Sequence, residues 1–281
     1  MPSASTRRFD VTTAEFAVYG DRRLRLDLRR ATEPTAPIVV YLHGGAWVVG
    51  TRADHPARLD GLAAAGVTVA SIDYRLVGEA PFPAQRADIE TAVKWLIDAG
   101  IAPSSSGIVL MGASAGAHLA ALACFTSRYR FAGFVGLFGR YDLSSAMETL
   151  LPIPGLPIPA EIISNTLPQG LEIPRQRLAA LAGVTPDELT EELLLGLSPV
   201  SHLTPGSPPL LLLHGLADAL VHHAHTSYFA DRANHVGVPC EVINIPAANH
   251  EDPLFDSAQY LDRIATFVKQ VTTTEIQKRA V

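Results

Sequence analysis

The chain has 281 residues, of which 48% are hydrophobic and 18% are charged, and its formal net charge is −6. This apolar content supports a large buried core and excludes global disorder, and the length fits one α/β domain. The negative charge argues against a nucleic-acid-binding protein, because phosphate neutralisation requires clustered lysine and arginine. Cys124 and Cys240 are too few for a disulfide framework, so we expect small buried thiols and a cytoplasmic location.

We expect neither a targeting segment nor a membrane span. Arg7 and Arg8 are followed by Glu15 and Asp21 rather than by the apolar run that an export signal needs. The longest stretch without charge, residues 99–127, contains proline, serine and glycine between two apolar blocks. A buried strand followed by a buried helix explains this stretch better than a transmembrane helix does.

The hydrophobic pattern predicts strands that alternate with helices. A period of two over residues 9–30 indicates a pair of solvated strands near a sheet edge. Apolar runs predict buried strands at residues 38–42, 67–72 and 108–111, and the pattern predicts further strands at residues 131–138, 209–213 and 240–245. Helical spacing predicts helices at residues 56–65, 84–99, 113–125, 222–234 and 255–271. The fold class is therefore α/β, with a mostly parallel sheet covered on both faces and a ligand site at the carboxyl ends of its strands.

The composition changes between about residues 143 and 197, where six prolines fall between Pro152 and Pro174. Two short helices are predicted to follow, the second of them opened by a capping box from Thr185 to Glu188. Because this block lies between two strands, we interpret it as a lid or cap insertion in a single domain of residues 1–281. Its candidate pocket residues, which would serve equally as lid core, are Leu150, Ile153, Leu156 and Ile158.

The segment Gly112-Ala113-Ser114-Ala115-Gly116 is a G-x-S-x-G motif between a predicted strand and a predicted helix. A nucleophilic serine must project from a sharp strand-to-helix turn, and small flanking residues let neighbouring elements approach it. The alternative is a glycine-rich turn with an incidental serine. The strand-turn-helix context favours Ser114 as a nucleophile.

A serine hydroxyl needs a base to take its proton and a carboxylate to orient that base. In proteins with this strand-turn-helix motif the three residues follow in the chain order serine, acid, histidine. Asp218 lies just beyond the strand at residues 209–213, and His250 follows the strand at residues 240–245. We therefore expect both side chains to reach Ser114 at one edge of the sheet.

Four other carboxylates could hold the histidine in principle, but only Asp218 sits at a strand end in the right order. These rivals are Asp142, Asp231, Glu251 and Asp252.

The remaining histidines have structural interpretations. We expect His214 to be buried and hydrogen-bonded, and His118 to face the interior from the helix that follows Ser114. A cluster near residue 222 lacks a ligand set with zinc spacing, so we predict exposed histidines at a helix N-terminus and no metal site. The cluster consists of His222, His223 and His225. No role is assigned to His55 and His202.

Acyl transfer also needs hydrogen-bond donors aimed at the oxyanion. Residues 43–46 follow the first buried strand, and their glycines allow backbone N–H groups to point into the site. The N–H of Ala115 would supply the remaining donor. The alternative is an ordinary glycine turn without a catalytic role. The presence of the nucleophile motif in the same chain favours the oxyanion interpretation.

Together these motifs resemble those of α/β-hydrolase esterases similar to hormone-sensitive lipase and kynurenine formamidase. The shared motifs are His43-Gly44-Gly45-Ala46-Trp47, Asp73-Tyr74-Arg75-Leu76, Pro81-Phe82-Pro83-Ala84, Gly112-Ala113-Ser114-Ala115-Gly116-Ala117-His118-Leu119-Ala120, Ser198-Pro199-Val200 and His214-Gly215-Leu216-Ala217-Asp218. The resemblance implies an α/β-hydrolase fold with Ser114, Asp218 and His250 as the triad. It also implies Gly45, Ala46 and Ala115 as the oxyanion donors.

Two positions depart from the pattern. Ala46 stands where lipase-like members usually carry a third glycine. The resulting sequence His43-Gly44-Gly45-Ala46-Trp47 resembles that of the kynurenine-formamidase-like members instead. Ala113 stands where lipase-like members often have an acidic residue and formamidases often have histidine. The substrate is therefore less constrained than the mechanism.

These observations predict a serine esterase that forms an acyl-enzyme on short-to-medium acyl or aryl esters, with no cofactor. Gly44 and Trp47 are assigned to substrate binding. The same triad would serve an arylformamidase, acting on N-formylkynurenine-type amides, or a lactone hydrolase. A non-catalytic receptor on this fold, as in the gibberellin receptor, is disfavoured because all three triad residues are present. The expected partner is a small ester, and an exposed edge strand would support a homodimer.

Overall fold

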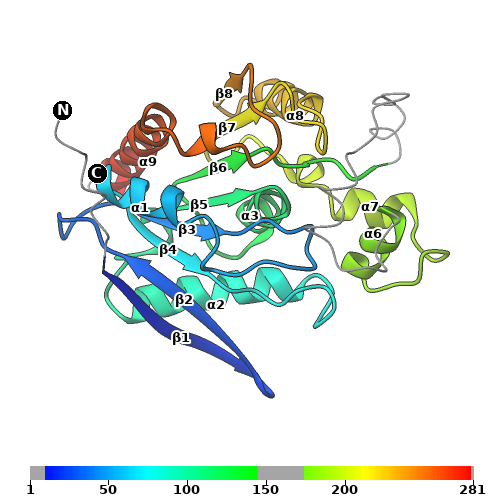
Figure 1. Cartoon of the computed structure of the whole chain (residues 1–281), viewed down its shortest axis with the longest axis horizontal. Coiled ribbons are helices and arrows are strands. Elements are labelled where there is room, and N and C mark those ends of the chain that lie inside the picture. The colour runs from blue at the N-terminus through cyan, green and yellow to red at the C-terminus, as the bar shows by residue number, and fades with distance from the viewer. Residues whose placement is uncertain (1–9, 145–173, 280–281) are drawn as a thin grey trace.

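Eight strands form one sheet in the computed structural model, which describes residues 10–144 and 174–279 (Figure 1). The strands are β1 (Val11–Tyr19), β2 (Arg22–Arg29), β3 (Ile38–Leu42), β4 (Thr68–Ile72), β5 (Ile108–Ala113), β6 (Gly133–Leu137), β7 (Leu210–Gly215) and β8 (Cys240–Ile245). Their order across the sheet is β1-β2-β4-β3-β5-β6-β7-β8. Strands β3 to β8 pair in parallel, whereas β1 and β2 form an antiparallel hairpin at one edge. The predicted mostly parallel sheet is confirmed.

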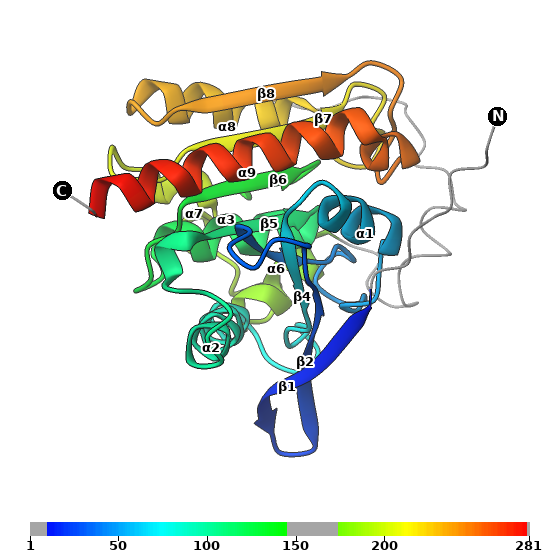
Figure 2. The same ribbon diagram turned by 90° about the vertical axis from the view of Figure 1, so that its left-hand side faces the viewer.

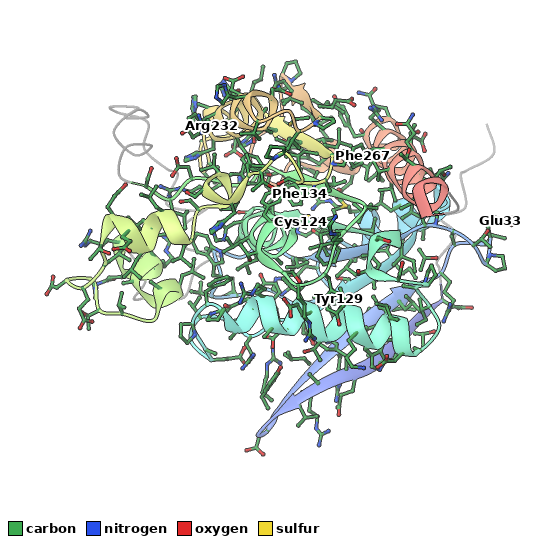
Figure 3. The ribbon with its side chains drawn as sticks, turned by 180° about the vertical axis from the view of Figure 1, so that it is seen from behind. Glu33, Cys124, Tyr129, Phe134, Arg232 and Phe267 are labelled. Atoms are coloured by element: carbon green, nitrogen blue, oxygen red, sulfur yellow. The ribbon has the colours of Figure 1, made fainter. Side chains whose placement is uncertain are left out.

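Helices cover both faces of the sheet, as the continuous apolar strands require. The helices that pack on it are α1 (Pro56–Ala64), α2 (Ala84–Asp98), α3 (Ala115–Thr126), α8 (Ala224–His235) and α9 (Ala258–Arg279). Alternate residues of a strand point to opposite faces, so Val40 joins the core beneath α2, α3 and α8, whereas Val39 joins the core beneath α1 and α9. Figure 2 shows α9 running across β5 and β6. Figure 3 shows Cys124 and Phe134 close together inside the molecule, with Phe267 on the α9 side.

Several element ends differ from the predicted ones. The last helix begins at Ala258, after a 3₁₀ turn η3 (Pro253–Asp256), because Ser257 is extended and separates the two. Helix α8 begins at Ala224 rather than at residue 222. The predicted strand at residues 131–138 shortens to β6, although Phe131 and Phe138 are buried, because burial alone does not place a residue in the strand ladder.

The edge hairpin is less solvated than its charge pattern suggests. Arg29 is buried and pairs with Asp60 through Nε and Oδ1 at 2.6 Å. Asp27 is also buried, where it accepts hydrogen bonds from Arg52 Nε at 2.9 Å and from Thr13 Oγ1 at 2.7 Å. The prediction of a solvated strand pair is therefore wrong for the second half of β2, whose charges are paired.

Between β6 and β7, the described residues 174–209 include the short helices α6 (Pro174–Ala182) and α7 (Glu191–Gly196) and a 3₁₀ turn η2 (Pro199–His202). In Figure 1, α6 and α7 lie beyond the carboxyl ends of the strands. The predicted pocket residues Leu150, Ile153, Leu156 and Ile158 lie outside the described residues. The lid itself stays a prediction.

The second of these helices does not begin at the predicted capping box. Thr185 N does donate to Glu188 Oε2, as one half of a capping box requires. The Thr185 hydroxyl, however, donates to the same carboxylate oxygen, and Glu188 N bonds to Thr185 O, so the segment closes an isolated turn. Helix α7 begins after Thr190 instead, whose hydroxyl accepts from Leu193 N.

The uncharged stretch at residues 99–127 forms β5 and α3, as predicted. In the ranges that the structure describes, no helix is long and apolar enough to cross a membrane. Both cysteines are free thiols. Cys124 is buried, whereas Cys240 begins the edge strand β8 and is partly exposed, which corrects the expectation that both are buried.

Candidate active site

Ser114 occupies the turn between β5 and α3. Its backbone has φ 52° and ψ −120°, which is a strained conformation for a residue with a side chain. A Cβ added to Gly116 would lie 2.2 Å from the carbonyl oxygen of Leu42, and one added to Gly112 would lie 2.3 Å from the Gly116 carbonyl carbon. The two glycines of the motif are therefore required by the close approach of α3 to the strands. This geometry is the sharp turn that a projecting nucleophilic serine needs.

His250 lies between Ser114 and Asp218, on the loop that follows β8. Its Nε2 is 3.0 Å from Ser114 Oγ, and its Nδ1 is 2.7 Å from Asp218 Oδ2. Because a carboxylate only accepts, Nδ1 carries the ring proton and Nε2 is free to accept from the serine hydroxyl. The structure thus brings the three predicted residues into one hydrogen-bonded chain at the carboxyl edge of the sheet.

Asp218 is held by four donors. Its Oδ1 accepts from the amides of Leu220 and Val221 at 2.9 and 2.8 Å, and its Oδ2 lies 3.2 Å from His214 Nε2 in addition to His250. Burial by itself would raise the pKa of Asp218, but the hydrogen bonds from His214 and His250, the charge of His250 and the Val221 amide outweigh it. They hold the pKa of this carboxyl well below its usual range, so Asp218 is ionised at neutral pH.

His214 is buried and hydrogen-bonded, as predicted, and it also contacts the candidate triad. Its Nε2 faces two acceptors, Val221 O at 2.8 Å and Asp218 Oδ2, so that nitrogen carries the proton. Its Nδ1 accepts from the hydroxyl of Thr226 at 2.6 Å. His214 is therefore a second imidazole donor to the carboxylate that orients His250.

Asn249 connects the two loops that carry His250 and Asp218. Its Oδ1 accepts from the backbone N of His250 at 2.7 Å and from that of Ala219 at 3.0 Å. The ring of Phe138 packs edge-on against the imidazole of His250, with centroids 4.8 Å apart. Sequence reasoning missed both residues, and the position of Asn249 immediately before His250 was the available signal.

The loop after β3 has an unusual backbone. Gly45, Ala46 and Trp47 all have positive φ, at 113°, 51° and 67°. A Cβ on Gly45 would lie 2.1 Å from the carbonyl oxygen of Val49, so only glycine fits there. Among the described residues, no acceptor is hydrogen-bonded to the amides of Gly45, Ala46 or Ala115. The role of these three amides as oxyanion donors stays a prediction.

His43 and Tyr74 pack against each other at the start of this loop. Their rings stack with centroids 4.3 Å apart, and the Tyr74 hydroxyl donates to His43 O at 2.9 Å. His43 is buried, and this burial lowers the pKa of its imidazole. Both residues belong to the motifs that carry the family resemblance.

The two residues assigned to substrate binding have different surroundings. A Cβ on Gly44 would lie 3.4 Å from Ser114 Cβ and 2.7 Å from Glu251 Oε1, so Gly44 lies against the candidate nucleophile. Trp47 is only 8% exposed, and its indole Nε1 donates to His118 Nδ1 at 3.2 Å. The indole N–H of Trp47 is therefore used inside the protein, and both assignments stay predictions.

Glu251, one of the rival carboxylates, does not orient His250 but lies beside the oxyanion loop. It has φ 55°, and its Oε1 lies 3.8 Å from His55 Nε2 as well as close to Gly44. Burial lowers the pKa of His55. A carboxylate thus lies beside Gly44 with an imidazole next to it, and the only sequence signal for this pair was the position of Glu251 directly after His250.

The histidine cluster at the start of α8 is only partly as predicted. His223 precedes the helix, its ring is tilted 33° against that of His222 with centroids 4.3 Å apart, and both residues are partly buried rather than fully exposed as predicted. His225 is buried rather than exposed, and this burial lowers its pKa to about 3. His202 Nε2 donates to Gly196 O at 2.9 Å, because a carbonyl oxygen only accepts. In the described part of the chain no group of three or more histidine, cysteine or acidic side chains is arranged to hold a metal.

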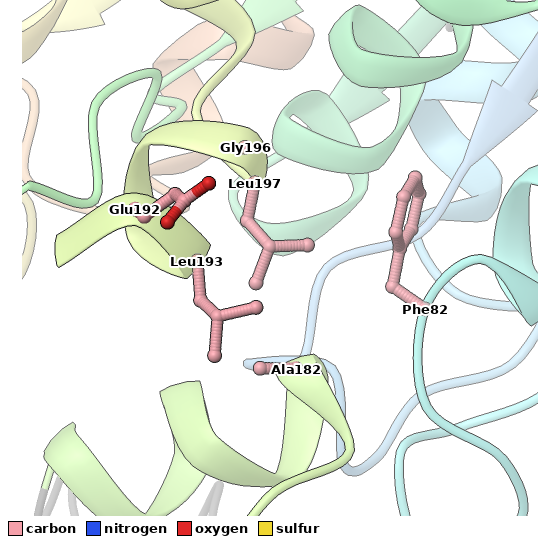
Figure 4. Close-up of a pocket in the computed structure, with 6 residues that line it drawn as sticks. All are labelled: Phe82, Ala182, Glu192, Leu193, Gly196 and Leu197. Atoms are coloured by element: carbon pink, nitrogen blue, oxygen red, sulfur yellow. The ribbon is translucent and has the colours of Figure 1, made fainter. Parts of the chain in front are cut away.

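A cavity of about 580 Å³ opens between α6, α7 and the loop before α2 (Figure 4). Figure 4 shows Leu193, Leu197 and Phe82 around a common space, with Glu192 at its margin. The lining residues are Phe82, Ala182, Glu192, Leu193, Gly196 and Leu197. Apart from one carboxylate these side chains are apolar, which suits an uncharged group of small-molecule size.

Comparison with known proteins assigns the family. The model of the BD-FAE family matches residues 24–232, and the chain belongs to this family. Among curated proteins it is 29% identical to Esterase LipC of Mycobacterium tuberculosis (strain ATCC 25618 / H37Rv), over 92% of this chain and 66% of the relative. It is 34% identical to hormone-sensitive lipase of Bos taurus, over 47% of this chain and 18% of the relative. The chain spans about half to two thirds of the length of the first curated relatives.

Solved structures confirm the predicted fold. Esterase LipW from Mycobacterium marinum matches with a TM-score of 0.73 at 20% identity, over 94% of this chain and 82% of that chain. A truncated carbohydrate esterase from gut microbiota matches with a TM-score of 0.72 at 21% identity, over 95% and 98%. The α/β-hydrolase fold and the resemblance to hormone-sensitive-lipase-like esterases are thus both confirmed.

Proposed function

We propose that this protein is a serine hydrolase of carboxylic esters. The observation that carries the proposal is the hydrogen-bonded chain from Ser114 Oγ through the His250 imidazole to Asp218, with distances of 3.0 and 2.7 Å. Relatives named esterase and carboxylic ester hydrolase support the same chemistry. A usable base next to the serine favours an enzyme over a non-catalytic receptor, because a receptor has no need of it.

The reaction proceeds in two steps. Ser114 Oγ attacks the ester carbonyl carbon while His250 Nε2 takes the hydroxyl proton, and the imidazolium is stabilised by the ionised Asp218. The tetrahedral intermediate collapses when His250 gives this proton to the leaving alkoxide oxygen, which departs as an alcohol. Water then attacks the acyl-enzyme with His250 again as base, and the acid product leaves Ser114 with its proton restored.

The amides of Gly45, Ala46 and Ala115 stabilise the oxyanion in both steps. Preorganised donors of this kind act without reorganisation at the moment of reaction, and the removal of one typically raises the barrier by about 2.7–4 kcal/mol. Gly45 and Ala46 are consecutive residues with positive φ, and we infer that their N–H groups face the space beside Ser114. Glycine at position 44 keeps that space open beside Ser114.

The substrate is an uncharged ester with a short-to-medium acyl or aryl group. The cavity beside α7 has a volume of about 580 Å³ and an apolar lining, so it accommodates a hydrocarbon chain or a ring. Its Glu192 disfavours an anionic group at that end. We propose that the insertion around residues 143–197 completes the wall of this pocket as a lid.

A panel of p-nitrophenyl esters of graded chain length, with N-formylkynurenine and a lactone, tests the proposal. Wild type should turn over the esters, a fluorophosphonate should label Ser114, and Ser114→Ala should abolish both while the protein stays folded. Ser127→Ala is the matched control, since Ser127 ends the same helix and contacts Glu90. Faster turnover of N-formylkynurenine or of the lactone than of every ester would replace the ester assignment, and an unlabelled, inactive wild type would reject it.

A further inference from the structure

His118 lies one helical turn after Ser114, and both of its ring nitrogens have partners from distant parts of the chain. Its backbone N bonds to Ser114 O at 3.1 Å, and its side chain is fully buried. Trp47 Nε1 lies 3.2 Å from Nδ1, and Leu197 O lies 2.8 Å from Nε2. One imidazole therefore joins the oxyanion loop to the end of α7.

The partners determine the protonation state of this ring. An indole N–H only donates, so Nδ1 of His118 accepts from Trp47, and a carbonyl only accepts, so Nε2 donates to Leu197. A second ring proton would put two donors face to face at Trp47. Burial, moreover, lowers the pKa of His118 to about 4, so the ring is neutral at neutral pH. His118 is thus held in one tautomer with no spare hydrogen-bonding group.

The contact with Trp47 restrains the strained part of the oxyanion loop. Trp47 has φ 67° and follows directly on Gly45 and Ala46, which also have positive φ. Its side chain is anchored by His118, and its carbonyl accepts from Val77 N at 3.0 Å. Conformations of this kind persist only where surrounding contacts hold them.

The other partner belongs to the cavity. Leu197 follows α7 as its C-cap residue, and its side chain lines the cavity together with Leu193 (Figure 4). The hydrogen bond to His118 fixes the Leu197 carbonyl against α3. The cavity wall and the oxyanion loop therefore meet at a single side chain that is itself rigidly attached to the nucleophile's helix.

We propose that His118 is a positioning residue that holds the oxyanion loop in register with Ser114 and ties it to the α7 wall of the cavity. This role rests on the proposed ester hydrolysis. The loop amides act mainly on the charge that develops in the transition state, so a displaced loop lowers kcat and leaves KM nearly unchanged.

Trp47→Phe tests the role, because it removes the indole N–H and keeps an aromatic ring in the core. For p-nitrophenyl acetate we expect kcat to fall about tenfold, which is the equivalent of one hydrogen bond, with KM within about twofold. The inhibition constant of a trifluoromethyl ketone, whose adduct with serine carries the oxyanion, should rise by about the same factor. Trp95→Phe on α2 is the matched control and should change neither value.

Two exchanges at His118 separate hydrogen bonding from packing. The amide of His118→Gln can accept from Trp47 and donate to Leu197, so its kcat should stay within about threefold of wild type, whereas His118→Leu should lose at least as much as Trp47→Phe. The inference is overturned if folded Trp47→Phe keeps wild-type kcat and ketone inhibition and loses only thermal stability. It is also overturned if the glutamine and leucine variants are equally impaired. An inactive, unlabelled wild type would instead reject the ester hydrolysis itself, and this role with it.

Discussion

Replacement of Asp218 by asparagine is the most informative single change at the site, because it keeps the shape of the side chain and alters one group. Asp218 Oδ1 accepts from the Leu220 and Val221 amides, so the asparagine oxygen stays there and its NH₂ takes the place of Oδ2. That NH₂ then faces His250 Nδ1, which is 2.7 Å from Oδ2 in the wild type.

An amide N–H only donates, so His250 must accept at Nδ1 and carry its proton on Nε2. In this tautomer Nε2 cannot take the proton of Ser114, from which it is separated by 3.0 Å. We expect kcat to fall about 10,000-fold, which corresponds to about 5.4 kcal/mol in the barrier. KM should change little, because Asp218 is buried behind the imidazole.

The assay is steady-state hydrolysis of p-nitrophenyl acetate, with the folded fraction measured by circular dichroism. Asp142→Asn is the control, since Asp142 is also buried and accepts from Ser144 N at 2.8 Å, but has no contact with His250. Its kcat should stay within about threefold of wild type, as expected for a site outside the reacting groups. A folded Asp218→Asn variant with more than about a tenth of the wild-type kcat would refute the tautomer argument.

The same variant has a consequence for acid stability. The pKa of Asp218 is lower in the folded protein than in the unfolded chain, so its stabilising contribution is complete above about pH 4 and is lost as the pH falls further. The free energy of unfolding of wild type should therefore exceed that of Asp218→Asn at pH 7. Urea titrations should show this difference shrinking below pH 4, and a difference independent of pH would contradict the assignment of the charge.

Three further changes test the packing, the acid sensitivity and the cavity. Gly116→Ala puts a Cβ 2.2 Å from Leu42 O and should lower the free energy of unfolding by about 3 kcal/mol in urea, whereas Gly78→Ala, which meets nothing within 4 Å, should change it by less than about 0.5 kcal/mol. Because the folded pKa of His118 is about 4 against 6.5 for the unfolded residue, the unfolded chain binds this proton first as the pH falls from 7 to 5. Between pH 7 and pH 5 the free energy of unfolding of His118→Gln should therefore fall by about 2 kcal/mol less than that of wild type. Leu193→Trp should raise KM for p-nitrophenyl octanoate about tenfold and leave the acetate unaffected, and an equal effect on both esters would place the acyl chain elsewhere.

The features that the sequence predicted well depend on local patterns or on one general property of parallel sheets. Strands β3 and β8 have the predicted bounds, because β3 is an apolar run that begins after Pro37 and β8 lies between Pro239 and Pro246. Ser114, Asp218 and His250 were selected because each follows a predicted strand. Since parallel strands end at one edge, positions far apart in the chain meet there without any knowledge of side-chain contacts.

Local patterns failed where the same hydrogen bonds serve more than one structure. Thr185 N bonds to Glu188 Oε2 as in a capping box, yet the helix starts after Thr190, because one closed turn does not oblige the next residues to continue it. At Arg29 the charge suggested solvent, but an ion pair with Asp60 lets the guanidinium be buried. In both cases the local chemistry was satisfied and the larger context decided the structure.

The contacts around His118 mark the limit of such reasoning most clearly. The sequence predicted an interior histidine, but its role depends on Trp47 and Leu197, which lie 71 and 79 positions away in the chain. A histidine can donate or accept at either nitrogen, so its function in the fold follows from which partner reaches which nitrogen. The fold places the indole N–H of Trp47 at one ring nitrogen and the carbonyl of Leu197 at the other. Because these two partners differ, the buried ring is held in one tautomer and connects the oxyanion loop to the cavity wall.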